Sequence, residues 1–562
     1  NPASVREDTR ITSSYTLAHP FGKHQVRIGA DFRNDNSLTE SNSNARGTFT
    51  YTGLYTTNGA QAAQDSGADF ADFLLGLPEQ ATLQAGGNTN LREHYFDAYF
   101  DDNWQASSRL TFSLGLRWEV EMPYYEVNGQ MANLDVSPDF TAAQVVCPVV
   151  VPGVCGPMGS LSGTTYPAGL VNTDWKNVGP RLGVAYRILP KTVLRGSYSI
   201  TYNQASYASI ARQLVGQPPF ASAETNAGSL ADPLTTATGL EDVLSATTNN
   251  YGVDPNYEPG MIQIWNTTVS RDLYKNWTFI VGYTGTKGTD LDLLRAPNRN
   301  PDGTLRIAGV QPFIWESSGG HSLLNLGNFQ VRRRLAHGFG AGLNYTLSRS
   351  MDNASSLGAG GAVVAQNDQD LAAEYALSNF NRTQTFAADL LWELPFGLNR
   401  KWFSNGGVLA ALFGEWSLTT TFSANSGFPF TPRVVGATSS VANGTSGALR
   451  ANLLPGVPIQ LADPSLLDFF NTAAFQVPAV GDFGTSPRNS IIGPGGHVAN
   501  LSFNRDMRLN GNQAVTLQVN INNLFNTIQW TTIDTNVNSA TFGEVTKFAS
   551  MRQITINLRY RF

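Results

Sequence analysis

Charged residues are scarce in this sequence, and long apolar runs are missing. Only 14% of the 562 residues are charged, the formal net charge is −6, and the one basic cluster is residues 332–334. A nucleic-acid partner therefore has little electrostatic support. Long stretches rich in alanine, glutamate, lysine and leucine are also absent, which argues against an all-helical protein. The 54 glycines and the 11% of aromatic residues instead favour many strands and turns.

A membrane helix is not predicted anywhere in the chain. No stretch approaches the roughly 18 consecutive apolar residues that such a helix needs. A β-barrel, however, crosses a bilayer with about ten residues per strand that are apolar only at alternate positions, so a mean hydropathy of −0.19 is compatible with a membrane location. The first residues, "NPASVREDTR", lack the features of a signal peptide. We expect either that a signal peptide was removed or that the numbering begins inside a longer protein.

Cysteine is nearly absent as well. Cys147 and Cys155 are the only two, and both lie in "VVCPVVVPGVCGP", a segment too rich in proline and glycine to be a membrane strand. Two neighbouring cysteines in a loop fit a disulfide formed outside the cytoplasm, and two unpaired thiols are the alternative.

What the chain does contain is alternation of apolar and polar residues over unusually long stretches. In "RLTFSLGLRWEV" (109–120), in "AVTLQVNINNLF" (514–525), in "GFGAGLNYTLSRS" (338–350) and in the last twelve residues, "MRQITINLRYRF", every second residue is apolar or aromatic. Period two over ten or more residues predicts long strands with one apolar and one wet face. Ordinary strands have about five or six residues, whereas strands of about 10 to 13 fit a tilted membrane crossing. Eleven further candidates bring the count to about fifteen: 11–18, 24–35, 91–103, 179–189, 191–203, 261–273, 276–286, 323–335, 380–394, 414–424 and 497–509.

The links between these strands alternate in length. Tight turns such as "LPK", "YKN", "AHG" and "NGN" alternate with long links at 121–178, 204–260, 287–322, 351–379, 425–496 and 526–550, and the link 395–413 is intermediate. Outer-membrane barrels have short periplasmic turns and long extracellular loops. The pattern therefore predicts an all-β, antiparallel transmembrane barrel whose C-terminus lies in the periplasm. A soluble β-propeller or β-sandwich is the alternative, but no repeat of about 40 to 50 residues supports it.

Several segments, taken in order, resemble the Oar-like β-barrel family of TonB-dependent outer-membrane transporters. They are "HQVRIGADFR" (24–33), "YFDAYFDDNWQASSRLTFSLGLRWE" (95–119), "VGPRLGVAYRI" (178–188), "QIWNTTVSRDLYKNWTFIVGYTGTKGTDL" (263–291), "GLNYTLSRSMDNAS" (342–355), "ALSNFNRTQTFAADLLWELPFG" (376–397), "VNINNLFN" (519–526) and the C-terminal "RQITINLRYRF". The resemblance implies a barrel of 22 strands, preceded by a plug domain and a TonB-contacting segment that are not found here. We therefore expect residues 1–562 to be the C-terminal portion of such a barrel, and a complete, smaller, plug-free barrel is the alternative.

No motif for catalysis is present, and the six histidines are scattered, so an enzyme and a resident cofactor are not expected. Asp368, Asp370 and Glu374 lie in the predicted loop segment "AQNDQDLAAEY". Their oxygens can hold Ca²⁺, but the EF-hand pattern is missing, and a solvated acidic loop is the favoured interpretation.

The candidate site residues lie in the lumen, the loops and the last strand. Arg117, Glu119, Asn344, Gln518, Asn520, Asn557 and Arg559 form a polar, inward-facing set that suits a wet lumen. Aromatic residues of the predicted loops can stack on a sugar or peptide or can pack locally: Tyr251, Tyr257, Phe313 and Trp315. Phe562, with Tyr560 and Leu558 on the same face, resembles the signal that the outer-membrane assembly machine reads.

The sequence thus predicts an outer-membrane receptor barrel that moves a large or scarce solute. Membrane lipids, the assembly machine and an unidentified solute are the expected partners. The resemblance adds the TonB complex, which would act through a plug that is not in this chain. A passive porin and a structural or adhesive surface protein remain as alternatives.

Overall fold

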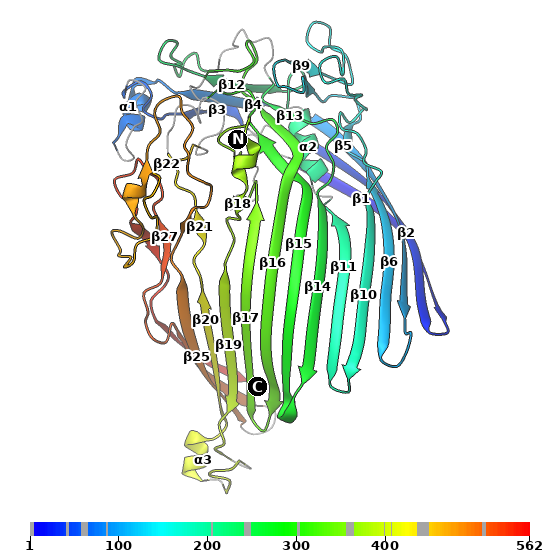
Figure 1. The fold of residues 1–562 in the computed structure, drawn as a ribbon, viewed down its shortest axis with the longest axis vertical. Coiled ribbons are helices and arrows are strands. Elements are labelled where there is room, and N and C mark those ends of the chain that lie inside the picture. Colours follow the sequence, from blue (N-terminus) through cyan, green and yellow to red (C-terminus); the bar gives the residue numbers. More distant parts are fainter. Residues whose placement is uncertain are drawn as a thin grey trace.

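The computed structural model describes residues 5–40, 44–57, 66–85, 88–203, 206–240, 249–300, 304–355, 363, 365–397, 400–405, 407–434, 449–508 and 513–562. Fifteen long strands follow one another in chain order and form one curved antiparallel sheet, which we call the wall (Figure 1). They are β1 Val5–Phe21, β2 His24–Glu40, β5 Asn88–Trp104, β6 Leu110–Glu121, β10 Val178–Leu189, β11 Thr192–Tyr202, β14 Met261–Asp272, β15 Trp277–Arg295, β16 Ile314–Ala336, β17 Phe339–Asp352, β19 Gln384–Glu393, β20 Trp416–Asn425, β25 Gly496–Arg508, β26 Ala514–Asn522 and β29 Gln553–Arg561. Every predicted long strand is therefore present.

Three short strands extend the wall to 18 strands in all. They are β7 Tyr125–Glu126, β13 Tyr251–Val253 and β18 Ala376–Leu377. β13 runs parallel to the upper end of β16, whereas the long strands pair antiparallel with their neighbours in the chain. At the two edges, β1 pairs with β2 and β29 pairs with β26, and no pairing within the described parts of the chain joins β1 to β29.

The strand register gives the wall one apolar and one polar face. Leu517 lies opposite Leu558 and Val519 lies opposite Ile556, while the intervening Gln518 lies opposite Asn557. The same alternation continues across the sheet, because directly paired residues of antiparallel strands point to the same side. On the apolar face, Leu116, Leu182 and Ile556 keep about half or more of their surface exposed (50%, 49% and 67%). No other layer of the described structure covers this face.

The two ends of the wall differ in their links (Figure 1). At one end, six of the seven links have two to five residues, such as Gly22 and Lys23 between β1 and β2. His337 and Gly338 join β16 to β17 with positive φ angles of 53° and 74°, as expected for a two-residue hairpin turn of the mirror-image type. Register places Arg561 beside Ala514, so the C-terminal strand ends here too. The seventh link, residues 394–415, contains helix α3 (Val408–Phe413).

All seven long links lie at the opposite end; six of them were predicted, and the seventh, between β2 and β5, was not among the predicted long links. We call their described residues the cap: those within 44–85, 122–177, 203–260, 296–313, 353–383, 426–495 and 523–552. The predicted link 287–322 is shorter than expected, because β15 continues to Arg295 and β16 begins at Ile314.

The cap contains small sheets, short helices and four hydrophobic clusters. Its remaining elements are β3 Asn44–Thr50, α1 Ala68–Leu75, β4 Gln80–Ala85, β8 Asn133–Val136, β9 Ala143–Val146, α2 Ser206–Val215, β12 Ser222–Ala227, η2 Leu371–Glu374, β21 Pro429–Phe430, β22 Asn452–Leu453, η3 Thr472–Ala474, β23 Phe475–Gln476, β24 Ile491–Ile492, β27 Trp530–Ile533 and β28 Val545–Phe548, and η1 Tyr274–Asn276 lies in a short turn. Within the described residues, no helix has both the length and the apolar character needed to span a bilayer.

Candidate functional site

The polar face of the wall carries a dense charged group on β2, β5 and β6. Arg33 lies between Glu93 and Glu121, with distances of 3.1 and 3.4 Å from its Nη2 atom to the two carboxylates. Arg117 Nη2 donates to Asp97 Oδ2 at 2.7 Å. These side chains meet because alternate residues of neighbouring strands share one face. Arg117, which the sequence assigned to the inward set, therefore belongs to a charged network.

A groove of about 810 Å³ lies on the same face, nearer the short turns. Residues from β1, β2, β5, β6, β10 and β11 line it, among them Arg27, Asp101, Arg181 and Ser199. Arg27 pairs in register with Asp101, so charges of both signs line one surface. Such a lining can donate and accept hydrogen bonds to a polar solute or to another polar protein surface.

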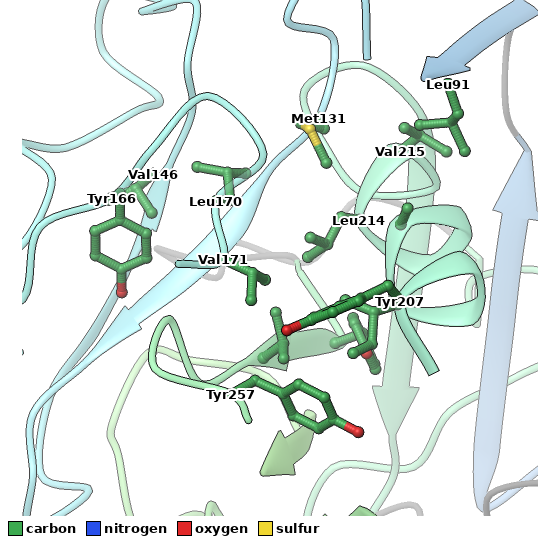
Figure 2. Close-up of a cluster of buried hydrophobic side chains, with 14 residues drawn as sticks. Leu91, Met131, Val146, Tyr166, Leu170, Val171, Tyr207, Leu214, Val215 and Tyr257 are labelled. Atoms are coloured by element: carbon green, nitrogen blue, oxygen red, sulfur yellow. The ribbon is translucent and has the colours of Figure 1, made fainter. Parts of the chain in front are cut away.

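Helix α2 lies against the polar face at the cap end. Its residues Ala208 and Arg212 line a pocket of about 360 Å³ together with Arg10 and Asp35, which are joined by two hydrogen bonds of 2.7 Å. On another side, α2 contributes Leu214 and other apolar residues to a buried cluster with Leu91 of β5 (Figure 2). The helix is thus held by packing at the entrance to the polar side of the wall.

Two of the four predicted contact aromatics, Tyr251 and Tyr257, are buried in this cluster. Their exposed fractions are 5% and 2%, and Figure 2 shows Tyr257 beside Tyr207 of α2. Tyr251 donates to Glu316, and Tyr257 donates to Asp292. Burial, with a smaller contribution from Asp292, raises the pKa of the Tyr257 phenol.

The other two, Phe313 and Trp315, belong to a second cap cluster, with exposed fractions of 2% and 5%. In this conformation, therefore, all four aromatic side chains pack against neighbouring residues, and their rings do not face solvent. Sequence patterns could not distinguish these outcomes, because partners of the rings come from several different links.

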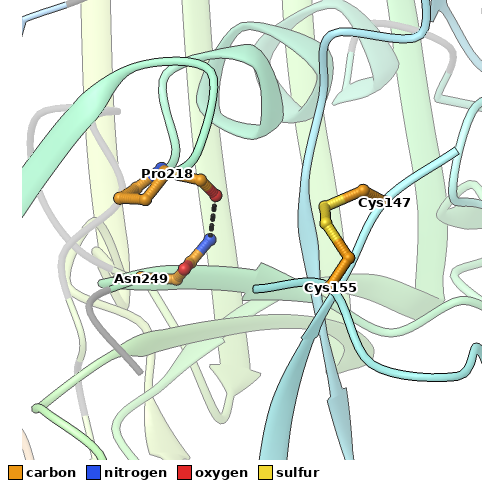
Figure 3. Close-up of a disulfide and its surroundings, with 4 residues drawn as sticks. All are labelled: Cys147, Cys155, Pro218 and Asn249. Carbon is orange, nitrogen blue, oxygen red and sulfur yellow. Dashed lines mark hydrogen bonds between the residues drawn. A yellow bond between two sulfur atoms is a disulfide. The ribbon is translucent and has the colours of Figure 1, made fainter. Parts of the chain in front are cut away.

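Cys147 and Cys155 form a disulfide in the cap, with their Cα atoms 5.8 Å apart (Figure 3). Cys147 is 1% exposed and belongs to the same cluster as Phe313. Figure 3 also shows the neighbouring link, where Asn249 Nδ2 donates to the carbonyl oxygen of Pro218 at 3.0 Å. The disulfide therefore closes a small loop whose two cysteines pack in and against the hydrophobic core of the cap.

The acidic side chains considered for Ca²⁺ do not point to a common centre. Asp368 accepts two hydrogen bonds of 2.8 Å from Arg295, and Glu374 accepts one of 2.7 Å from Arg450. Asp370 instead accepts from the backbone N–H of Ala373 and caps a short helix. Among the described residues, no group of three or more histidine, cysteine, aspartate or glutamate side chains is arranged to hold a metal ion.

The last strand lies at one edge of the wall, and all its residues are exposed. Leu558 and Tyr560 are 71% and 52% exposed on the apolar face, and Phe562 is 92% exposed just beyond β29. Asn557 and Arg559 face the polar side, opposite Gln518 and Thr516.

Sequence reasoning missed α2 and the buried ion pairs of the cap. In α2, Ile210 and Leu214 are four residues apart and Tyr207 precedes Ile210 by three, a helical spacing that could have been recognised. No comparable signal joins Arg488 to Asp352, which pair at 2.6 Å although 136 residues separate them.

Solved structures and a family model of outer-membrane proteins are similar to this chain. Among solved structures, the chain matches the outer-membrane transporter YddB from Escherichia coli (10% identity, TM-score 0.47, covering 98% of this chain and 54% of that one). It also matches the ferric-catecholate import receptor Fiu from E. coli K12 (12%, 0.43, 98% and 54%) and the siderophore receptor PirA from Acinetobacter baumannii (10%, 0.46, 100% and 55%). The chain thus spans about half the length of these structures. Among curated proteins, none matches it significantly. A family model described as "Outer membrane beta barrel domain" matches residues 1–555, and the chain accordingly belongs to the outer membrane β-barrel domain family.

Proposed function

We propose that this chain forms most of the wall and the cap of a TonB-dependent, Oar-like receptor that moves a large or scarce solute across the outer membrane. The observation that carries the proposal is the polar, charge-bearing face of the wall beneath folded long links. A wet inner surface suits passage of a polar solute, and a folded cap can bind it first. The ordered resemblance of eight segments to the Oar-like family supports the same function.

In the part of the chain that the structure describes, β1 pairs only with β2 and β29 pairs only with β26. In a bilayer, an unpaired strand edge leaves backbone donors and acceptors without partners, at a cost of several kcal/mol for each group. We propose that further strands of a barrel of up to 22 join β1 to β29, and that a plug inside it contacts the charged polar face and the TonB complex. The short-turn end, with the C-terminus, would then face the periplasm and the cap would face outward.

Uptake measurements with and without TonB test this function. In cells that depend on this protein, we expect uptake of one class among ferric siderophores, oligosaccharides and short peptides to be lost when its gene is deleted, and lost equally when TonB is deleted. Uptake that survives without TonB, with steady conductance in planar bilayers, would identify a passive porin. Uptake that is unchanged by deletion of the gene would leave a structural or adhesive role.

We also propose that Phe562, together with Tyr560 and Leu558, is read during assembly. These side chains form a continuous exposed apolar stripe at the edge of the wall. Deletion of Phe562 should lower the amount of heat-modifiable protein in the outer membrane. The control is Phe548→Ala, which removes an exposed aromatic ring from the cap and should not lower that amount. Equal insertion of the two variants would contradict this role.

A further inference from the structure

The link at 394–415 is longer than the turn that it makes requires. The other six links at this end reverse the chain with two to five residues, whereas this one uses 22. We call its described residues, 394–397, 400–405 and 407–415, the α3 loop. Figure 1 shows it projecting beyond the short turns. The hairpin could close without it, so connecting β19 to β20 does not account for the length of the loop.

The surface of the α3 loop is strongly apolar. Val408 and Leu412 are four residues apart on α3, as are Leu409 and Phe413, so each pair lies on one side of the helix. These four side chains are 52–75% exposed, and Trp402 of the same loop is 54% exposed. In water, this much exposed apolar surface on one loop is unfavourable, which indicates that something covers it.

The α3 loop is attached to the apolar face of the wall. Trp416 lies opposite Arg505, and Arg505 lies opposite Leu517, so both side chains share the face that also carries Leu558. Trp416 Nε1 and Arg505 Nη1 both donate to the carbonyl oxygen of Leu412, at 3.3 and 3.2 Å. The apolar surface of α3 therefore continues the apolar face at its short-turn end.

The polar groups around α3 fit the boundary between lipid tails and headgroups. Arg505 lies over the ring of Trp416 at 5.7 Å, and Lys401 lies over Trp402 at 5.7 Å. Arg400 is partly neutralised by Glu393 at 3.0 Å, whereas Lys401 is exposed. Tryptophan with lysine or arginine is the combination found where membrane proteins meet headgroups.

We propose that the α3 loop lies in the headgroup region of the phospholipid leaflet at the short-turn end and anchors the wall there. Val408, Leu409, Leu412 and Phe413 enter the upper part of the acyl chains, and Lys401 and Arg505 contact phosphate groups. The occupant is a lipid surface and not a protein, since the apolar surface is continuous with the face that the bilayer already covers. The choice of leaflet rests on the proposed orientation, but contact with lipid does not depend on transport.

A single fluorescent label tests this placement. The only two cysteines of the chain are bonded to each other, so Leu409→Cys adds the one free thiol, to which a nitrobenzoxadiazole dye can be attached. The protein is reconstituted into phosphatidylethanolamine and phosphatidylglycerol vesicles without other proteins. Asn405→Cys, at an exposed polar position of the same loop, and Leu467→Cys, at a 67% exposed apolar position of the cap, are the matched controls.

We expect the dye at position 409 to be quenched strongly by lipids that carry a doxyl group near the headgroup and several-fold less by iodide than the dye at position 467. Iodide quenching that is equal at the two positions overturns the proposal. Protection at 409 that appears only in native outer-membrane fragments also overturns it, because a protein would then cover the loop. Heat-modifiable migration on gels confirms that each labelled variant is folded, and the outcome is independent of any uptake measurement.

Discussion

The wall and the cap bury their side chains in different ways. The largest fully buried side chains of the described structure, including Tyr207, Tyr257, Phe313 and Phe470, all belong to the links. The apolar residues of the wall, such as Leu558, are instead exposed on one face of the sheet. The hydrophobic effect in water stabilises the cap, as in a soluble protein. The apolar face of the wall instead requires a bilayer as its solvent. Substitutions in the cap should therefore change its stability in water, whereas substitutions on the apolar face of the wall should change stability in a bilayer.

The largest effect is expected for the buried ion pair between Arg488 of the cap and Asp352, the last residue of β17. Arg488 is 3% exposed, pairs with Asp352 at 2.6 Å and donates to the carbonyl oxygens of Glu374 and Ser355. Arg488→Ala leaves a buried carboxylate without its partner and should destabilise the cap by about 3–5 kcal/mol. Hydrogen exchange of the amide of Ser378, which donates to Ser350, measures this loss.

The control for this prediction is Arg400→Ala at the other end of the molecule. Its ion pair with Glu393 is 41% and 34% exposed, so its loss should cost at most about 1 kcal/mol. Equal effects of the two substitutions would mean that the cap ion pairs are hydrated, and that the cap does not form a dry core.

The second prediction concerns pH and Glu79, which lies between α1 and β4. Burial, opposed by a hydrogen bond from Thr52 and assisted by nearby Asp72, raises the pKa of the Glu79 carboxyl to about 7. A folded-state pKa above the unfolded value means that the folded cap binds the extra proton. Stability should therefore be greatest below about pH 4.5 and fall as the pH rises toward 7, by about 3 kcal/mol.

Glu79→Gln should remove this pH dependence and make the native cap less stable than the variant above pH 7. Hydrogen exchange of the Gly228 amide, which donates to the Glu79 carbonyl oxygen, measures the free energy of opening below and above pH 7. Parallel pH profiles of the native protein and the variant would show that the carboxyl is solvated.

The third prediction separates the two faces of the wall. Val519 lies on the apolar face between Phe503 and Ile556, whereas Gln518 lies on the polar face. Val519→Arg should destabilise the barrel in a bilayer by about 2–4 kcal/mol, because a charge deep in lipid is costly. Gln518→Arg should have a much smaller effect. Urea unfolding in phospholipid vesicles compares them, and a reversed order would mean that the faces are assigned the wrong way round.

The smallest effect is expected for the disulfide of the cap. Cys147 and Cys155 are eight residues apart, so their bond closes a short loop and should contribute about 2–3 kcal/mol. Replacing both cysteines by serine should speed proteolysis of the cap but leave heat-modifiable migration of the wall unchanged. A change in migration would show that the cap and the wall unfold together.

The sequence predicted every long strand of the wall, although strands such as β1, expected at 11–18, extend well beyond the predicted bounds. The strands expected at 179–189 and 191–203 are Val178–Leu189 and Thr192–Tyr202 in the structure. This agreement has a physical origin. A strand between lipid and a wet interior must alternate apolar and polar residues, so the local sequence of each strand indicates its surroundings. The same logic located the long and short links.

The cap could not be predicted in this way. For Tyr251 and Trp315, the sequence left ligand stacking and local packing both open, and only the folded arrangement of several links shows that they are core residues. The link predicted at 395–413 was expected to be of intermediate length, and its helix and apolar surface were not anticipated. In these segments, burial depends on contacts between residues that are far apart in the chain. The local periodicity of the sequence does not indicate such contacts.

The sequence by itself thus determined the antiparallel strands, their order, their two faces and the alternation of their links, because these depend on backbone geometry and on the immediate surroundings of each strand. Only the tertiary structure decided which loop side chains form the dry core of the cap. It also decided which buried charges pair, as Arg488 does with Asp352, and where the α3 loop meets the apolar face. These contacts join distant segments, and their energies arise only when the whole chain has brought those segments together.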